Sequence, residues 1–418
     1  MKLEDIGFYT LNDERAMNVS KTSRMQRCEL ILTDACNFRC PYCKGLRNDC
    51  KGTISLERAK EIVDYWCKDN LKNIRFSGGE PTVWKDLVEL VKYTKSKGVE
   101  RIAISTNGYS DFSLYKELIE AGVNDFSISL DACCADFGDK MSGGVVGSWE
   151  KVTENIRKIA KLSYVTLGVV VTEETVKDLA KTINFAASLG VADIKIISSA
   201  QYNTLLEGAK EVDETVWKKY PILKYRIENI ENGRNVRGLK ETDSHRCGLV
   251  LDDSAIAGSF HFPCIIYMRE GGNPIGKVSE NMREERALWS ENHDTHKDPI
   301  CKRNCLDVCI DYNNKYQKFR IVKQNKVPHI DSTLFTYDLW NAGSVHDLGI
   351  EHFRFENLSD HKEKIKENLI GFCFGEELAC RPKENEVALM YEREDGTRFW
   401  FHIRNSEFVE IFCKGDLG

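Results

Sequence analysis

The sequence has few prolines, no long apolar run and no excess of basic charge. No window of its 418 residues approaches the ~20 uncharged apolar residues of a membrane span, and the start, MKLEDIGFYTLNDERA, lacks the apolar region of a secretory signal. Only 8 prolines, with 42% hydrophobic residues, exclude a disordered or collagen-like chain. The net charge of -6 argues against a broad nucleic-acid-binding face. We therefore expect an ordered cytoplasmic protein, with no membrane and no polymeric nucleic acid as partner.

Cysteine is abundant instead, with 16 residues in the chain. A cytoplasmic compartment keeps thiols reduced, so cysteines at short spacings are typical of metal sites rather than of disulfides. The positions of the clustered cysteines therefore carry most of the functional information.

Between residues 27 and 200, short β-branched runs alternate with segments whose apolar residues follow helical spacing. The alternation predicts a parallel sheet and, with six units, an α/β fold of the partial (β/α)6 barrel type. The near-continuous apolar strands further predict burial on both faces. The expected strands are 28–33, 73–77, 101–106, 125–130, 165–172 and 193–198, and the expected helices are 55–70, 83–98, 113–122, 148–162 and 173–190.

The rest of the chain divides into segments of different composition and periodicity. We expect a lead at 1–26, a polar helical bridge at 201–244, a cysteine-rich region at 245–320 and a small α+β domain at 321–418. The cysteine-rich region has few long periodic segments, so we expect ligation to supply part of its stability. In the last domain, a helix capped by Ser359 and a hairpin turning at Asp395-Gly396 are predicted.

Three cysteines crowd one loop directly after the first predicted strand: Cys36, Cys40 and Cys43. Zinc sites usually present cysteines in separated pairs. Three thiolates instead suit three corners of a 4Fe-4S cluster whose fourth iron stays open to a further ligand. A zinc loop or three buried thiols is the alternative.

The spacing CxxxCxxC, with Tyr42 before the last cysteine, resembles the signature of the radical S-adenosylmethionine (SAM) superfamily. The resemblance implies that the open iron binds the amino and carboxylate groups of SAM. It also implies that the reduced cluster cleaves SAM to a 5'-deoxyadenosyl radical, which takes a hydrogen atom from a substrate. An external electron donor such as flavodoxin or ferredoxin is then required.

Further segments similar to that family end the next strands. Gly78, Gly79 and Glu80 follow the second strand, where glycines permit close backbone approach and a carboxylate accepts hydrogen bonds from an ammonium. The ends of parallel strands converge on barrel active sites. The resemblance assigns Tyr42, Ser105, Asn107, Ser129 and Thr172 to SAM binding as well, and Asp131 to catalysis. Ordinary caps of the following helices are the alternative for each.

The cysteine-rich region resembles the SPASM or twitch extensions of the superfamily, which hold auxiliary clusters. Its pattern departs from the full SPASM pattern, so one auxiliary 4Fe-4S cluster is expected, and which of the last three cysteines is spare stays open. A zinc site is the alternative. His245 and His261 are expected to be structural, and the vicinal pair Cys133-Cys134 and the other scattered cysteines to be ordinary packing residues. The five candidate ligands are Cys247, Cys264, Cys301, Cys305 and Cys309.

Three hypotheses address the substrate. The first is a small polar metabolite such as a nucleoside derivative. The second is a peptide, although only a short segment precedes the first strand, where peptide-modifying relatives often carry a leader-binding module. The third is a non-catalytic metal-binding scaffold. The whole-chain layout, with its FYTLNDERA lead, resembles the queuine lyase branch, which releases the base queuine from queuosine or queuosine 5'-phosphate.

Overall fold

The computed structural model describes residues 13–199 and 208–324, together with short strands in the rest of the chain. It divides into two compact units, Met1–Lys315 and Tyr316–Gly418. Among the described residues, no helix combines the length and the apolar character of a transmembrane span. The strands described beyond residue 324 are 334–335, 355–356, 372–373, 386–392, 398–404 and 407–414.

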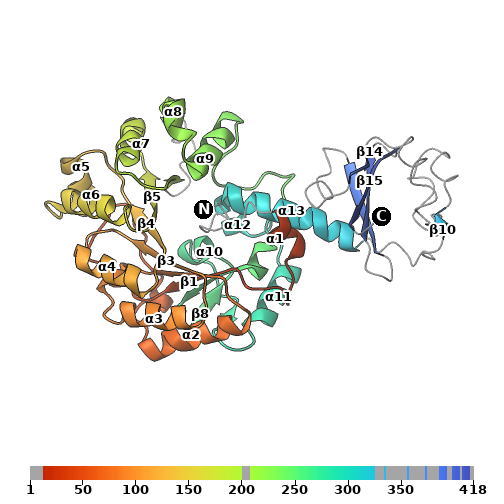
Figure 1. Cartoon of the computed structure of the whole chain (residues 1–418), viewed down its shortest axis with the longest axis horizontal. Helices are drawn as coiled ribbons and strands as arrows, with labels where there is room; N and C mark the ends of the chain where they lie inside the picture. Colours follow the sequence, from red (N-terminus) through yellow and green to blue (C-terminus); the bar gives the residue numbers. More distant parts are fainter. Residues whose placement is uncertain are drawn as a thin grey trace. The chain divides into compact units, whose positions relative to one another are not determined.

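The first unit is built on one open sheet of nine strands (Figure 1). Strands β1 to β6 are parallel and lie in chain order, which confirms the predicted partial barrel. Their bounds are β1 Arg27–Ile31, β2 Asn73–Ser77, β3 Arg101–Thr106, β4 Asp125–Ser129, β5 Tyr164–Val171 and β6 Asp193–Ser198.

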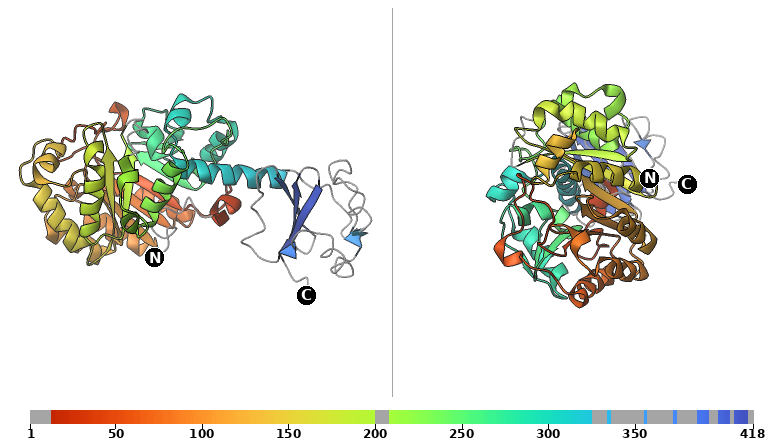
Figure 2. Two further views of the ribbon diagram at one scale, coloured as in Figure 1. Left: turned by 90° about the horizontal axis from the view of Figure 1, so that it is seen from above. Right: turned by 90° about the vertical axis from the view of Figure 1, so that its left-hand side faces the viewer.

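Helices cover the outer face of these strands, as all views show (Figures 1 and 2). Five correspond to predicted helices, and the short α5 (Ala135–Met141) was not expected because its seven residues carry no apolar repeat. The five are α2 Leu56–Lys68, α3 Leu87–Ser96, α4 Phe112–Ala121, α6 Ser148–Ile159 and α7 Leu179–Ser188.

Helix α2 shows how sequence sets this layer. Ser55 caps its first turn by accepting a hydrogen bond from the backbone N–H of Arg58 at 3.2 Å. Ala59, Ile62 and Val63 lie at helical spacing and are buried against the sheet. Burial of an aliphatic side chain of the size of Ile62 stabilises the fold by about 2 kcal/mol.

The inner face of the strands differs from the expectation. Outward-facing residues such as Ile74 and Ile104 pack under the helices, whereas Arg75, Ser105 and Lys195 line a cavity. The predicted burial on both faces is therefore met only in part, because inward side chains such as Arg75, Ser105 and Lys195 are half-buried around the cavity. Polar and apolar side chains are mixed on this inner face.

The cysteine-rich region completes the sheet. Strand β7 (Asp253–Ala257) pairs in parallel with β1, and β8 (Phe260–Phe262) forms a hairpin with β7. The pairing with β1 was not predicted, because it joins segments more than 200 residues apart. Strand β9 (Gly276–Lys277) closes this edge.

Long helices also occur in this region, against expectation: α11 (Met282–Asn292) and α13 (Asp307–Gln324). On α11 the buried residues include Arg286 and Ser290, so polar side chains mask the apolar repeat. The other helices are α1 Asp13–Asn18, α8 Glu214–Trp217, α9 Pro221–Glu231, α10 Ile265–Arg269 and α12 Pro299–Asn304.

The second unit contains two small sheets. The larger has the order β12-β15-β14-β13, and the predicted hairpin is confirmed as the antiparallel pair β13 (Glu386–Glu392) and β14 (Arg398–Arg404). Its partners are β15 (Glu407–Lys414) and β12 (Phe372–Cys373). Strands β10 (Leu334–Phe335) and β11 (Phe355–Glu356) form the smaller sheet. The turn at Asp395-Gly396 and the helix start at Ser359 lie outside the described residues.

Candidate active site

The loop after β1 presents the cysteine triplet to the cavity. Cys36 and Cys40 are half-buried, Cys43 is exposed, and all three line the cavity. The backbone N–H of Phe38 donates to the Cys36 sulfur at 3.4 Å, and that of Gly45 donates to the Cys43 sulfur at 3.4 Å. Such donors favour thiolate, the form that binds metal. Burial raises the pKa of Cys40 to about 12, so a bound cationic centre is needed to hold that thiolate.

Two glycines let the end of β2 approach this loop. The N–H of Gly79 donates to the carbonyl of Thr33 at 2.7 Å, and that of Glu80 donates to the carbonyl of Ala35 at 2.8 Å. A Cβ added to Gly78 would lie 2.4 Å from the oxygen of Thr33, and one added to Gly79 only 2.3 Å from that of Ala35. The glycines therefore contact the chain just before the cysteines.

Glu80 is 1% exposed and joins the ends of β2 and β3. Its Oε1 accepts hydrogen bonds from Thr82 N–H (3.1 Å), Thr82 Oγ1 (2.7 Å) and Thr106 Oγ1 (2.7 Å). Its Oε2 accepts from Asn107 N–H at 2.7 Å. Burial raises the pKa of Glu80, while these hydrogen bonds oppose that shift. Oε2 thus accepts one hydrogen bond from the described residues and has the capacity for a second donor.

The other SAM candidates divide into two groups. Ser105, Asn107 and Ser129 line the cavity at the ends of β3 and β4. The Asn107 side chain also donates to that of Asn37 in the cysteine loop at 2.7 Å. Thr172 does not line the cavity, and its hydroxyl instead accepts from backbone N–H groups of the next turn.

Asp131 holds the cysteine loop. Tyr42 Oη donates to Asp131 Oδ2 at 2.5 Å, and the N–H of Val170 donates to Oδ1 at 2.7 Å. Burial raises the pKa of Asp131 to about 6. Both carboxylate oxygens are thus engaged by the protein, so the contacts point to a positioning role for Asp131; its catalytic assignment stays a prediction.

The five cysteines of the second group interact electrostatically. Burial is the largest cause that raises the pKa of each thiol. For the four thiols other than Cys247, the charge of neighbouring cysteines of the group raises the pKa further. Cys264 and Cys309 line the cavity, whereas the other three do not. Cys247 precedes the short helix at 249–251, Cys264 caps α10, Cys301 lies in α12, Cys305 ends α12 and Cys309 lies in α13.

The spacing of these thiols helps to choose between zinc and a cluster. Among the described residues, three or more metal-binding side-chain atoms lie within 4.8 Å of one another only at His293, Asp298 and Cys301. Zinc with four thiolates needs sulfurs about 3.8 Å apart. Neither cysteine group, as described, has three sulfurs within 4.8 Å of one another. His293 was not anticipated, since only its position 3.8 Å from the Cys301 sulfur distinguishes it.

His245 and His261 have the contacts expected of structural residues. His245 stacks on His296, with centroids 3.9 Å apart, and its Nδ1 lies 3.1 Å from Asp294 Oδ1. His261 is fully buried, with Nε2 2.7 Å from Glu285 Oε2. Neither histidine lines the cavity.

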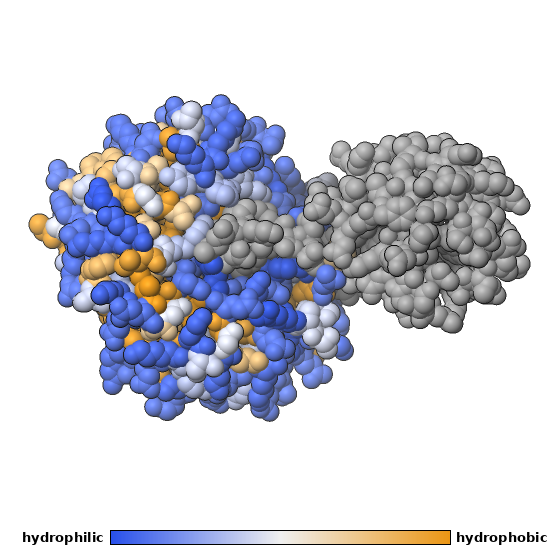
Figure 3. Space-filling model, in the orientation of Figure 1, coloured by the Kyte–Doolittle hydropathy of each residue, from blue (hydrophilic) through white to orange (hydrophobic). Residues whose placement is uncertain are grey.

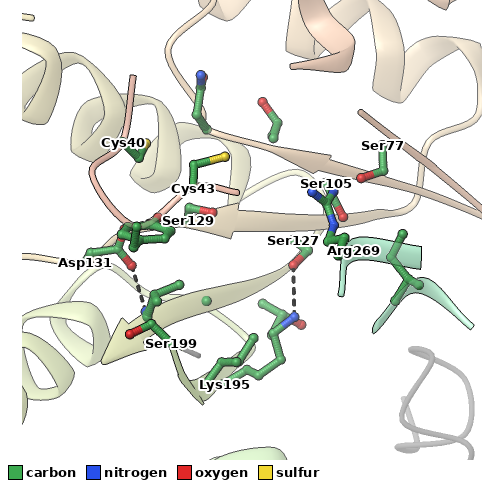
Figure 4. A pocket seen from close by; sticks show the side chains of 18 of the residues that line it. Cys40, Cys43, Ser77, Ser105, Ser127, Ser129, Asp131, Lys195, Ser199 and Arg269 are labelled. Carbon is green, nitrogen blue, oxygen red and sulfur yellow. Dashed lines mark hydrogen bonds between the residues drawn. The ribbon is translucent and has the colours of Figure 1, made fainter. Parts of the chain in front are cut away.

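One cavity of about 550 Å³ brings these parts together (Figure 4). Its lining includes the cysteine loop, the strand ends, Cys264 and Cys309. In the view of Figure 3, apolar surface gathers over the region of β3 to β5, and the surrounding face is mainly hydrophilic. The cavity has the volume of a site for a cofactor and a small molecule.

Comparison with protein families decides the identity of this region. Residues 30–186 match the family model of the Radical SAM superfamily. The chain contains a radical SAM domain. Radical SAM proteins bind a 4Fe-4S cluster and SAM, and the cavity beside this radical SAM domain has thiols and strand-end polar groups that suit both. The enzyme interpretation is therefore supported over a non-catalytic scaffold.

Curated relatives match part of this chain. A protein named probable GTP 3',8-cyclase from Sulfolobus acidocaldarius is 29% identical over 177 residues, which are 41% of this chain and 56% of the relative. GTP 3',8-cyclase from Pelotomaculum thermopropionicum is 39% identical over 130 residues, 29% of this chain and 40% of the relative. The chain thus spans about half the length of these relatives.

Solved structures were also compared. Streptococcus suis SuiB bound to the precursor peptide SuiA has a TM-score of 0.47 and 12% identity, covering 70% of this chain and 69% of that one. Native anSMEcpe with bound AdoMet has a TM-score of 0.45 and 18% identity, covering 71% of this chain and 95% of that one.

Proposed function

We propose that this radical SAM enzyme acts on a nucleoside-type small molecule, and that queuosine or queuosine 5'-phosphate, cleaved to queuine, is the first candidate. One observation carries the proposal. A single cavity of about 550 Å³ joins the cysteine loop to the cysteine-rich region, and charged and hydroxyl side chains line it among apolar ones. That volume and mixed lining suit a nucleoside beside the cofactor.

The chain's own residues take distinct roles in this proposal. Cys36, Cys40 and Cys43 hold the cluster, and the free lone pair of Glu80 Oε2 receives the ammonium of SAM. When bound, the cluster and SAM supply a carbon-centred radical that removes a hydrogen atom from the substrate. The Tyr42–Asp131 hydrogen bond fixes the loop that carries the cluster.

Four of the five cysteines at 247–309 hold one auxiliary 4Fe-4S cluster in this proposal. The charge that each neighbouring thiolate would carry raises the pKa of Cys305 and Cys309, so these thiols lie near one another and would ionise together only around a cation. The reductant is an external donor such as flavodoxin or ferredoxin.

The decisive test is a product assay. Reduced, cluster-reconstituted protein is incubated with SAM and queuosine 5'-phosphate, and free queuine and 5'-deoxyadenosine are measured. We expect both products from the native protein and neither from Cys40→Ala. Formation of 5'-deoxyadenosine without queuine would overturn the lyase assignment and leave the radical chemistry intact.

A second candidate is cyclisation of GTP, favoured by the names of the curated relatives. The same assay with GTP distinguishes the two, because cyclisation retains the base whereas the lyase releases it. A peptide substrate is the remaining alternative, and its test is 5'-deoxyadenosine formation that depends on added peptide.

A further inference from the structure

A lysine without an acidic partner lies inside the barrel. Lys195 extends from β6 toward Ser127, and its Nζ lies 3.5 Å from Ser127 Oγ (Figure 4). No described carboxylate forms an ion pair with it. Burial, with the charge of Arg75, lowers the pKa of Lys195 to about 8. The charges of Glu29 and Asp125 oppose this shift without forming an ion pair with Lys195. Burying an ammonium group without an ion-pair partner is costly, so an anion bound in the cavity would stabilise Lys195.

Several other cations of the cavity wall have such partners. Lys44 pairs with Glu270 at 2.6 Å, and Arg27 pairs with Asp253 at 3.2 Å. Among the described residues, Arg269 of α10 has no ion pair, yet it lines the same cavity. Lys195 and Arg269 are thus two cavity cations for which the described residues provide no ion pair.

Arg75 adds to this excess. Its guanidinium lies 3.6 Å from Asp125, but Asp125 is shared with Arg101 at 3.4 Å, so one carboxylate serves two arginines. Its Nε is buried and has no hydrogen-bond partner among the described residues. An Arg75 amino group also donates to Ser105 Oγ at 3.4 Å, which places the charge beside the β3 hydroxyl.

We infer that Lys195, Arg269 and Arg75 bind a phosphate monoester on the substrate. The inference rests on the proposed function and deepens it, since it makes the substrate a nucleotide rather than a nucleoside. A phosphate monoester carries about -1.5 to -2 charge and three acceptor oxygens, which matches several cations and two hydroxyls. A carboxylate has one charge and two oxygens.

The position of the subsite separates it from the SAM site. Ser105 and Ser127 are paired neighbours in the sheet. Each lies two residues before a SAM candidate, Asn107 on one strand and Ser129 on the other. Because parallel strands run toward the cavity mouth, the phosphate site lies deeper in the barrel.

The test uses the SAM-loaded holoprotein under anaerobic conditions. Dissociation constants of ribose 5-phosphate and ribose are measured by calorimetry for the native protein, Lys195→Met, Arg269→Gln and the control Lys116→Met, whose side chain is 63% exposed. We expect ribose 5-phosphate to bind at least about tenfold more tightly than ribose, and each cavity variant to lose about tenfold for the phosphate alone. Lys116→Met should change neither.

Melting temperature supplies a readout that separates ligand binding from folding. Without ligand, Lys195→Met should melt at a higher temperature than the native protein, because it removes an uncompensated charge. A lower melting temperature with unchanged phosphate affinity in both cavity variants would show a structural lysine. Equal binding of ribose and ribose 5-phosphate would also overturn the inference. A glutamate-containing tetrapeptide that binds as tightly as ribose 5-phosphate would overturn it too.

Failure of this inference differs from failure of the lyase proposal. Phosphate binding that is lost in the cavity variants, with no queuine formed, would retain the subsite and remove the lyase. Queuine released with equal kcat/KM from queuosine and its 5'-phosphate would retain the lyase and remove the subsite.

Discussion

At the scale of single residues, Glu80 links two strand ends through its carboxylate. Its oxygens accept four hydrogen bonds from three residues, and the residue is 1% exposed. Every one of these contacts needs an acceptor at Glu80. The site therefore depends on the ionised form even though burial raises the pKa of the group.

Replacing Glu80 by Gln should destabilise the fold. The new amide turns a donor toward existing donors, so we expect a loss of about 2 kcal/mol in the free energy of unfolding. Urea unfolding of the anaerobic holoprotein measures it. The matched control is Glu89→Gln, whose side chain is 59% exposed, and an equal effect of both substitutions would contradict the assigned role.

His261 predicts a pH dependence. Its Nε2 donates to Glu285 and its Nδ1, 3.4 Å from Arg286, accepts, so the ring is neutral. Burial lowers the pKa of His261 from 6.5 to about 3. Between these values the unfolded chain binds a proton that the folded chain does not, so the free energy of unfolding falls as pH decreases from 6.5 to 3. Above pH 6.5 the His261 ring is neutral in both the folded and the unfolded chain, so it no longer makes the free energy of unfolding depend on pH.

The measurement compares native protein with His261→Gln, which keeps one donor and one acceptor and does not titrate. Urea unfolding at pH 7.5 and pH 5.5 should show a larger difference for the native protein, by about 1 kcal/mol. The same pH difference in both proteins would mean that another group dominates.

Site residues could be predicted from the sequence where they belong to a motif with a short, fixed spacing. The cysteines of the 36–43 loop and Glu80 were found this way, and all line the cavity. Thr172 was assigned by its place at a strand end, and it serves the next turn instead. Lys195 was missed because a single lysine within an apolar strand gives no motif.

At the scale of elements, the contact between the end of β2 and the cysteine loop is set by glycine. Gly79→Ala places a Cβ 2.3 Å from the Ala35 oxygen, a backbone atom that cannot rotate away. We expect a loss of about 2 kcal/mol in unfolding free energy and a reduced iron content after reconstitution. Unfolding and iron analysis measure the two.

The control for this prediction is Gly168→Ala in β5. There the nearest heavy atom would lie 3.7 Å from the new Cβ, at the end of a flexible side chain. Near-native stability and iron content are expected. Full iron content in Gly79→Ala would show that the close contact does not position the loop.

Elements with strong local signals were predicted well, and those defined by distant partners were not. The six barrel strands and helix α2 have clear period and capping. Strand β7 is defined by its pairing with β1, which is distant in the sequence. Helix α11 buries Arg286, whose guanidinium donates to backbone carbonyls including those of Val250 and Phe262, an arrangement invisible in apolar periodicity.

At the scale of the whole molecule, metal content tests the two-cluster proposal. Anaerobically reconstituted protein should contain about eight iron and eight sulfide per chain, and the triple variant Cys36→Ala/Cys40→Ala/Cys43→Ala about four of each. Cys67→Ala, a half-buried cysteine outside both groups, is the control and should keep eight. Stoichiometric zinc in place of iron would contradict both assignments.

The cavity-lining side chains of the barrel are separate from its apolar layer, and this separation affects how the protein can evolve. Side chains such as Ser127 and Lys195 line the cavity and lie outside the apolar layer beneath the helices, so replacing them leaves that layer intact. Mutational tolerance is thereby concentrated where ligand preference is set. A scaffold of this kind acquires new substrates by exchanging a few inward side chains while its folding free energy stays nearly constant.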